Sequence, residues 1–388
     1  MKTLKDLNVK NKRVLVRCDF NVPLNEKGKI KDDFRIKQVI PTIEYLVKKG
    51  AKVILMSHLG RPEGKVVESL RLTPVQKKLA EYLDAPVAKA ADCIGKKIEK
   101  QTIEMKEGEI LLLENLRFHK EEEKNYGNFA KEISNLADVY VNDAFGVSHR
   151  AQASIVGVSK YLPSVAGLLF EKEVKILSRV LKNPWRPLIA IIGGVKIESK
   201  IKVIKQFLEK ADHLLIGGKI ANAILTVKGI YVGKPWPSKE AIKEIEKFKL
   251  TSTKLHLPVD AIASPDETGQ FYTRELAPAR VRKDEKLLDI GPETIKMFSK
   301  IIKDAKMIVW SGPLGLFEEP LFEKGTKAIA EEIAKNHRAF KIVGGGETVS
   351  ALSKFGLREK FDHISTGGGA MLSFLSGEEF PGLKVLEK

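Results

Sequence analysis

Several features that mark other protein classes are absent from this sequence. Only two of its 388 residues are cysteines, Cys18 and Cys93, and their spacing is not that of a metal site, which is typical of a protein from a reducing compartment. No apolar run approaches the length of a membrane-spanning helix, and the N-terminal stretch MKTLKDLNVKNKR lacks the apolar segment of a signal peptide. We therefore expect a soluble, cytoplasmic protein with no membrane partner.

Signatures of several nucleotide-binding and nucleic-acid-binding classes are also missing. The sequence contains no Walker A motif, no protein-kinase signature and no G-x-G-x-x-G after a first strand, which disfavours P-loop enzymes and dehydrogenases. The net charge is +17, but the lysines are mixed with glutamates in helical stretches such as 239–249 (KEAIKEIEKFK), as on a solvated helix face. Because zinc-finger and RNP-type motifs are absent too, no nucleic acid is expected as a partner.

The chain instead consists of apolar runs that alternate with amphipathic helical patterns, which is typical of βαβ units and parallel sheets. Its 388 residues exceed what one core usually supports, so two domains are expected. Residues 161–181 have apolar positions at helical spacing and end before Asn183-Pro184, which predicts a long helix between the domains. The predicted fold class is α/β, with two doubly wound, Rossmann-like parallel-sheet domains joined by that helix and a cleft between them. The candidate strands are RVLVRCDF, AKVILMSH, EILLLENL and ADVYVNDAF in the first half, and PLIAIIGG, ADHLLIGG, KLHLPVDAIA, KMIVWSGP, FKIVGGG and FDHISTGGG in the second.

The ends of the predicted strands carry different residues in the two halves. In 13–23 (RVLVRCDFNVP), polar Arg17, Asp19 and Asn21 alternate with apolar residues, which predicts a polar row on one face of the strand before Pro23 ends it. Ligands of open α/β sheets bind at the carboxyl ends of strands. The first half places cations there: Arg17, His58, Arg61, Arg117 and Arg150. The second half places glycines there, in IIGGVKIESK, LIGGKIA, WSGPLG, VGGGET and STGGGA.

Each kind of strand end indicates a ligand. Converging arginines suit a small, multiply charged anion, and glycine-rich turns that open helices suit the phosphates of a nucleotide. Each residue also has a plain structural interpretation. A lone arginine is usually a surface residue, a glycine pair is often only a tight turn, and His58 could be a buried structural histidine. The repetition over several strand ends favours the functional interpretation.

A series of motifs resembles one known family over nearly the whole chain. The motifs are RCDFNVP (17–23), DDFRIKQVIPTI (32–43), SHLGRP (57–62), NLRFHKEE (115–122), NDAFGVSHRAQAS (142–154), GGVKIESK (193–200), LPVDAIAS (257–264), LDIGPET (288–294), VWSGPLGLFE (309–318), VGGGET (343–348) and STGGGA (365–370). In this order they are similar to those of phosphoglycerate kinases. The resemblance implies reversible phosphoryl transfer between 1,3-bisphosphoglycerate and ADP, giving 3-phosphoglycerate and ATP. It also implies Mg²⁺ as the cofactor with ATP or ADP, small-molecule partners only, and a monomer.

The resemblance also implies domain limits and roles for single residues. It implies a 3-phosphoglycerate-binding domain over 1–165, an inter-domain helix over 166–182, a nucleotide-binding domain over 183–372, and a tail, 373–388, that packs back on the first domain to give a hinge. The implied phosphoglycerate site is Asp19, Asn21, Arg35, His58, Arg61, Arg117 and Arg150, with Arg17 structural. The implied catalytic residues are Arg35, Lys196, Lys200, Gly367 and Gly368, and Gly369 lies in the same loop. The nucleotide site is Lys200, Gly217, Gly218, Pro313, Glu318, Gly345, Gly346, Glu347 and Thr348, and Glu347 is the implied Mg²⁺ ligand.

The departures from the family pattern all fall on the nucleotide side. They are Ser199, Lys219, Leu287, Ser311 and Glu347, the last of which replaces a shorter aspartate. Three hypotheses remain open. The first is ordinary catalysis with a repacked site, the second is an altered nucleotide or metal preference, and the third is a phosphoglycerate-binding protein with little catalysis. Arg35 and Lys200 disfavour the third.

Overall fold

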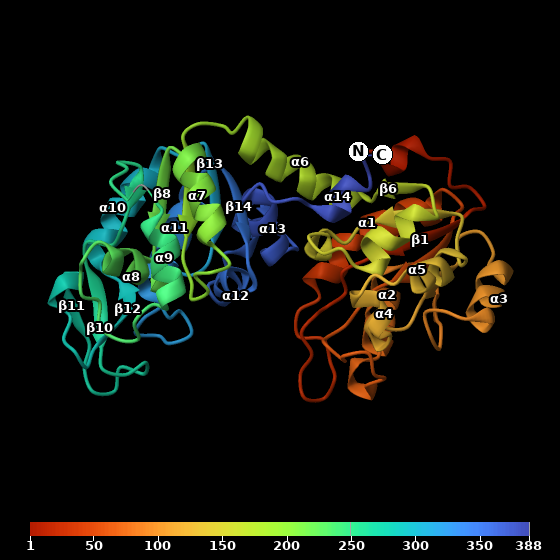
Figure 1. Ribbon diagram of the computed structural model, residues 1–388, viewed down its shortest axis with the longest axis horizontal. Coiled ribbons are helices and arrows are strands. Elements are labelled where there is room, and N and C mark those ends of the chain that lie inside the picture. Colours follow the sequence, from red (N-terminus) through yellow and green to blue (C-terminus); the bar gives the residue numbers. More distant parts are fainter. Residues whose placement is uncertain (249, 388) are drawn as a thin grey trace. The chain divides into compact units, whose positions relative to one another are not determined.

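The computed structural model describes residues 1–248 and 250–387, and within them the chain forms two compact units. Unit 1 comprises residues 1–176 together with the C-terminal segment that begins at Glu379, and unit 2 comprises Leu177–Glu378. Both units are α/β, with helices on either face of a parallel sheet (Figure 1). Among the described residues, no helix combines the length and the apolar character needed to cross a bilayer.

Unit 1 is built on a parallel sheet of six strands in the order β3-β4-β2-β1-β5-β6. Its strands are β1 (Arg13–Arg17), β2 (Lys52–Met56), β3 (Val87–Lys89), β4 (Ile110–Leu112), β5 (Val139–Asn142) and β6 (Ser164–Ala166). Its helices are α1 (Phe34–Lys48), α2 (Thr73–Tyr82), α3 (Lys96–Glu104), α4 (Lys120–Glu123), α5 (Gly127–Ser134) and α14 (Pro381–Lys384). Because β2 and β5 lie on opposite sides of β1, the strand order reverses at β1, where such sheets bind ligands.

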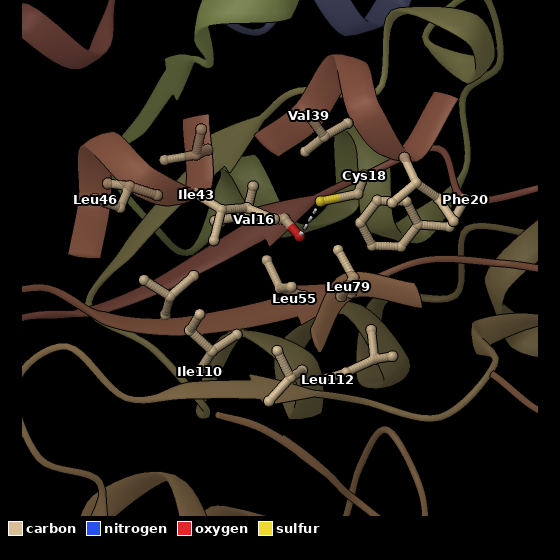
Figure 2. Close-up of a cluster of buried hydrophobic side chains, with 14 of the residues drawn as sticks. Val16, Cys18, Phe20, Val39, Ile43, Leu46, Leu55, Leu79, Ile110 and Leu112 are labelled. Atoms are coloured by element: carbon tan, nitrogen blue, oxygen red, sulfur yellow. Dashed lines mark hydrogen bonds between the residues drawn. The ribbon is translucent and has the colours of Figure 1, made fainter. Parts of the chain in front are cut away.

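The core of unit 1 follows the alternation of residues along its strands. Val14 and Val16 of β1 pack in one apolar cluster with α1 and α2, whereas Leu15 packs in another cluster on the opposite face of the sheet. Figure 2 shows part of the first cluster, to which Val39, Ile43 and Leu46 of α1 belong. The alternation continues past β1, because Cys18 and Phe20 also belong to the first cluster.

Unit 2 contains a second parallel sheet of six strands, in the order β15-β14-β13-β7-β8-β9, and a small antiparallel sheet, β11-β10-β12. The parallel strands are β7 (Leu188–Ile192), β8 (His213–Ile216), β9 (Leu255–His256), β13 (Met307–Ser311), β14 (Phe340–Gly344) and β15 (His363–Ile364). The antiparallel ones are β10 (Ala261–Ser264), β11 (Arg274–Leu276) and β12 (Lys286–Ile290). The helices are α7 (Ile201–Lys210), α8 (Gly218–Val227), α9 (Lys239–Glu246), α10 (Pro292–Lys303), α11 (Lys324–Lys335), α12 (Gly346–Lys354) and α13 (Gly368–Leu375). The order reverses between β7 and β13.

The structure confirms two α/β units, each built on a parallel sheet, and corrects three predicted elements. The long helix, α6 (Leu168–Lys182), begins later than the predicted 161, because Ser164–Ala166 pair with β5 as strand β6. The stretch KLHLPVDAIA is not one strand, because its two halves are β9 and β10 of different sheets. β1 ends at Arg17, so Asp19 and Asn21 follow the strand rather than lie in it. The division between the two units falls within α6.

Candidate functional site

In unit 1, the predicted anion-binding residues lie at or beyond the carboxyl ends of neighbouring strands. β4, β2, β1 and β5 are consecutive in the sheet and parallel, so the segments that follow them share one edge. Asp19 and Asn21 follow β1, His58 and Arg61 follow β2, Arg117 lies in the 3-10 turn Leu116–Phe118 after β4, and Arg150 follows β5. Together with Arg35 in the first turn of α1, these residues are called the arginine site below.

Hydrogen bonds connect three of these strand ends and α1. The Asn21 side-chain oxygen accepts from the Gly60 N–H at 2.9 Å, and the Gly60 carbonyl accepts from Arg117 Nη1 at 2.9 Å. Arg35 Nη1 donates to the Asn21 carbonyl at 2.9 Å and lies 3.4 Å from Asp19 Oδ2. The loops after β1, β2 and β4 are therefore held in fixed positions around the first turn of α1.

Arg17 is fully buried and has a structural role, as expected. It donates through Nε to Ser154 Oγ at 2.8 Å and through Nη1 to the Cys18 carbonyl, and its Nη2 lies 3.3 Å from His58 Nδ1. Because Arg17 carries only donors, His58 Nδ1 must accept, and its proton is on Nε2. Burial, and then the charge of Arg17, Arg117, Arg35 and Arg150, hold the pKa of His58 well below its ordinary value. His58 is therefore a neutral donor surrounded by the positive charge of these arginines.

Arg117 has donors that the protein does not use. The residue is 3% exposed, yet neither Nε nor Nη2 has a hydrogen-bond partner, and Nε lies only within ion-pair distance, 3.3 Å, of Glu123 Oε1. Burial lowers its pKa, and the neighbouring arginines lower it further. Buried N–H groups of a guanidinium are normally paired, so this arrangement favours an anionic ligand. Arg61 and Arg150 are exposed and add positive charge.

In unit 2, glycine-rich loops follow neighbouring strands of the parallel sheet. Gly193-Gly194 follow β7, Gly217-Gly218 follow β8, Gly312-Pro313 follow β13, Gly345-Gly346 follow β14, and the loop with Gly367 follows β15. Gly217, Gly345 and Gly367 precede the first residues of α8, α12 and α13. The N-termini of these helices face the carboxyl edge of the sheet, where backbone N–H groups and helix dipoles favour phosphates. These loops are called the glycine-loop site below.

Two of these glycines are required by the close approach of the loops. Gly312 has φ +95°, and a Cβ there would lie 2.1 Å from the Gly193 carbonyl oxygen. Gly218 has φ +61°, and its Cβ would lie 2.8 Å from the Gly194 nitrogen. Pro313 shares in this packing, because its carbonyl accepts from the Gly194 N–H at 2.7 Å. A side chain at either glycine would force the loops after β7, β8 and β13 apart.

The two lysines of the implied catalytic group, Lys196 and Lys200, both precede α7, which begins only at Ile201. Lys196 is exposed in the preceding turn, whereas Lys200 is 7% exposed and its ammonium donates to the Gly193 carbonyl. Burial lowers the pKa of Lys200 to about 8, against the opposing effect of the Glu347 carboxylate. The structure therefore places Lys200, rather than Lys196, among the glycine loops.

The other predicted nucleotide residues surround the N-terminus of α12. Thr348 is buried, and its Oγ1 accepts from the Gly312 N–H at 2.7 Å and donates to the Gly344 carbonyl at 3.2 Å. Glu347 is exposed in the first turn, and it lines an open pocket together with Glu318, Gly346 and Lys354. Gly368 lies against Gly345, since a Cβ on Gly368 would be 3.0 Å from the Gly345 Cα. The loops after β13, β14 and β15 thus meet at one place.

Four substituted positions have different surroundings. Lys219 is exposed in the first turn of α8, where a cation opposes the helix dipole. Ser311 is buried at the end of β13, and Ser199 Oγ donates to the Lys196 carbonyl at 3.0 Å. Leu287 helps to line a narrow pocket that also borders Gly218 and Leu314. Lys219 and Leu287 therefore lie near the glycine loops.

The sequence did not identify the residues that hold these sites in place. Ser154 Oγ, which accepts from Arg17, donates to Glu122 Oε1 at 2.5 Å, and Glu122 Oε2 accepts from the Ser154 N–H at 2.9 Å. In unit 2, Thr326 Oγ1 accepts from the backbone N–H groups of Leu314 and Gly315, both at 3.1 Å. Glu122 and Ser154 lie within recognised motifs, but their pairing across 32 residues is not visible in the sequence.

Comparison with known proteins gives one consistent result. A family model described as phosphoglycerate kinase matches residues 4–378. A curated protein named phosphoglycerate kinase from Borrelia garinii subsp. bavariensis is 50% identical over 393 residues and covers 100% of both chains. Another from Dictyoglomus turgidum is 49% identical over 388 residues, covering 99% of this chain and 98% of its own. The solved structure of phosphoglycerate kinase from Coxiella burnetii superposes with a TM-score of 0.87 at 39% identity, covering 99% of this chain and 98% of its own.

Proposed function

The chain belongs to the phosphoglycerate kinase family, and on that premise we propose how its two sites divide the work of the reaction. The enzyme is a kinase of glycolysis that transfers a phosphoryl group reversibly between 1,3-bisphosphoglycerate and ADP, giving 3-phosphoglycerate and ATP. The arginine site of unit 1 binds the phosphoglycerate, and the glycine-loop site of unit 2 binds the nucleotide. Both assignments rest on the chemistry of the residues present.

The observation that carries the assignment of unit 1 is the unused donor capacity of Arg117. Its Nε and Nη2 are buried without hydrogen-bond partners beside a neutral His58 that also offers a donor. A phosphate or carboxylate would satisfy these groups with charge-assisted hydrogen bonds. In this assignment Asp19 and Asn21 face the hydroxyl and carboxylate region of the substrate, and Arg61 and Arg150 add charge.

Catalysis requires positioning and charge stabilisation rather than a general base. In the direction of ATP consumption, the attacking group is a carboxylate that is already ionised, so no side chain has to remove a proton. Arg35 stabilises the transferring phosphoryl group, with Lys200 and the loop at Gly367 and Gly368 as its counterparts in unit 2. Domain closure, which would bring the two ligands together, stays a prediction.

Magnesium enters as the partner of ATP or ADP. The site fits a hard cation only in part: Glu347 is an exposed carboxylate in the pocket that also holds Glu318, and the described residues offer no group of three carboxylates there. Mg²⁺ usually keeps several waters and binds nucleotide phosphates, so one protein carboxylate is sufficient. The bound ion would neutralise charge on the phosphates, and Glu347 would orient it.

The decisive experiment is a steady-state assay of the purified protein with 3-phosphoglycerate and ATP over a range of Mg²⁺ concentrations. It is repeated with GTP and with Mn²⁺, because Lys219, Leu287 and Glu347 could retune the nucleotide or metal preference. Strong turnover with ATP and Mg²⁺ supports ordinary catalysis. Weak turnover that GTP or Mn²⁺ restores supports altered preference, and phosphoglycerate binding without turnover supports a binding protein.

The remaining proposals concern partners, oligomeric state and location. Both proposed ligands are small molecules, and we propose a monomer that acts in the cytoplasm without nucleic acid or membrane partners. Both cysteines are free and buried, which suits a reducing compartment. Sedimentation velocity would test the monomer directly.

A further inference from the structure

Three side chains that could bind a metal ion converge in unit 1 at residues to which the proposed function gives no role. They are Asp92, Cys93 and His119, which each offer one ligand atom, and these atoms lie within 4.8 Å of one another. Asp92 and Cys93 follow β3, and His119 follows β4 and the turn Leu116–Phe118. Because β3 and β4 are adjacent parallel strands, the sheet itself brings the three residues together.

The three residues are already ordered without a metal. His119 Nε2 lies 2.7 Å from Asp92 Oδ1, and the same oxygen accepts from the Cys93 N–H at 2.7 Å. The ring of His119 packs against Phe129 at 5.3 Å between centroids. The side chains of His119 and Asp92 remain 25% and 50% exposed, and His119 lines an open pocket with Glu121. An ion can therefore reach the cluster from solvent, whereas Cys93 forms its buried base.

We propose that Asp92, Cys93 and His119 form a binding site for one zinc-class divalent transition-metal ion, with water completing its coordination. Imidazole nitrogen, thiolate sulfur and carboxylate oxygen are together the ligands that such borderline-soft ions prefer, and Mg²⁺ does not select sulfur. Catalytic zinc sites likewise have three protein ligands and a fourth position that water or substrate occupies.

Binding requires small movements, the release of one proton and the shift of another within the His119 ring. Two ligands of a tetrahedral zinc ion stand roughly 3.4 Å apart at ordinary bond lengths, so the pair at 2.7 Å must open slightly. The Cys93 thiol loses its proton to solvent as the metal–sulfur bond forms, and the His119 proton moves from Nε2 to Nδ1. Burial raises the pKa of the Cys93 thiol, and the metal charge offsets that effect.

Occupation would connect two loops at the edge of the arginine site. His119 is two residues from Arg117, and the metal would tie this segment to the loop after β3. The expected consequence is a stiffer segment from β4 to α4 and a higher melting temperature at saturating metal, since only the folded chain presents all three ligands in place.

The test is a cobalt titration of the metal-free, full-length protein without nucleotide. Cobalt bound to a thiolate gives a near-ultraviolet charge-transfer band that binding to histidine or carboxylate alone does not give. We expect the band to saturate at one ion per chain and to disappear when Zn²⁺ is added. It should be absent from Cys93→Ser and kept in Cys18→Ala, the matched control that removes the other buried thiol. His119→Gln should weaken cobalt binding by about 10-fold or more.

Several results would overturn the proposal. They are the lack of a charge-transfer band in the wild type, a band that persists in Cys93→Ser, or a dissociation constant unchanged in His119→Gln. If Cys93→Ser does not fold, the half-exposed Asp92 and the partly exposed His119 still decide the question, because Asp92→Asn and His119→Gln leave the buried thiol intact. Catalytic activity is not needed for any of these measurements, so they are independent of the proposed kinase reaction.

Discussion

Among single residues, Lys200 gives the clearest pH dependence. Burial among the glycine loops holds its pKa at about 8, so the free enzyme loses this positive charge as the pH rises through that value. We predict that kcat/KM for ATP falls above about pH 8, because kcat/KM follows ionisations of the free enzyme. The matched variant Lys200→Arg keeps its charge and should lack this inflection. An inflection at the same pH in both proteins would assign it to another group.

Arg35 is the residue whose removal should separate binding from catalysis. Its guanidinium contacts the Asn21 carbonyl and Asp19, so it is held beside the proposed substrate in the first turn of α1. We predict that Arg35→Ala lowers kcat by roughly 100-fold to 1000-fold, in the range found when one charge-stabilising donor is removed, with a much smaller rise in KM for 3-phosphoglycerate. Arg61→Ala, at an exposed arginine, should instead act mainly on KM. A loss confined to KM in Arg35→Ala would contradict a transition-state role.

Substitution of Glu347 shows whether a protein carboxylate binds the Mg²⁺ ion. The residue is exposed in the first turn of α12, in the pocket with Glu318. If it binds Mg²⁺, Glu347→Asp should keep or improve activation by Mg²⁺ and change its half-saturating concentration, because the shorter arm moves the carboxylate relative to the ion. Activity is measured against free Mg²⁺, with Glu331→Asp on α11 as the control. Identical metal dependence in wild type and Glu347→Asp would mean that Glu347 is not a ligand.

At the scale of elements, Asp143 connects the end of β5 to the start of α6. The residue is fully buried, Oδ1 accepts from the Phe170 N–H at 3.0 Å, and Oδ2 has no hydrogen-bond partner. Burial raises its pKa to about 6. The folded chain therefore keeps this proton up to about pH 6, whereas the unfolded chain loses it near pH 4. Stability contributed by this group is present at low pH and lost as the pH rises through that window.

Asp143→Asn should remove this pH dependence. The quantity compared is the unfolding free energy of Asp143→Asn minus that of wild type. We predict that this difference increases by up to about 3 kcal/mol between about pH 4 and pH 7, because each pKa unit corresponds to 1.36 kcal/mol. The measurement is denaturant unfolding followed by far-ultraviolet circular dichroism at both pH values. Burial raises the pKa of Asp138, but the hydrogen bonds from Arg13 and its charge together lower it, so Asp138→Asn should show a change of the opposite sign. If the difference between Asp143→Asn and wild type does not change with pH, folding does not raise the pKa of Asp143.

The elements and their strand ends were largely predictable, whereas their exact limits were not. The alternation of Val16, Cys18 and Phe20 identified the buried face correctly, but strand pairing stops at Arg17, because a segment can keep its alternation without a partner strand. The glycine motifs identified the loops, but not that α7 begins only at Ile201 or that Lys200 donates to the Gly193 carbonyl. The Asp143 carboxylate and the Asp92–His119 pair arise from contacts between distant segments, for which a single sequence carries no local signal.

At the scale of the whole molecule, the tryptophans all lie in one unit, and the two chain ends both lie in the other. Trp185, Trp236 and Trp310 all belong to unit 2, so tryptophan fluorescence reports on that unit alone. The C-terminal segment packs against the rest of unit 1. Phe380 stacks on Phe145 at 5.1 Å between ring centroids, and the Gly382 N–H donates to the Ser148 carbonyl at 2.8 Å. Unfolding of the two units can therefore be followed independently, and one two-state transition should not be assumed.

Phe380→Ala should then destabilise unit 1 while leaving unit 2 unchanged. The side chain is 6% exposed, and truncation of a buried phenylalanine costs about 3 kcal/mol or more through lost burial and the cavity that remains. Far-ultraviolet circular dichroism follows both units, whereas tryptophan fluorescence follows unit 2. We expect the circular-dichroism transition of unit 1 to move to a lower denaturant concentration, while the midpoint of the fluorescence transition does not change. Gly382→Ala should act in the same direction, because its Cβ would lie 2.5 Å from the Ser148 Cβ. Equal shifts of both signals would show that the units unfold as one cooperative body, and the C-terminal segment would then stabilise the whole chain rather than unit 1.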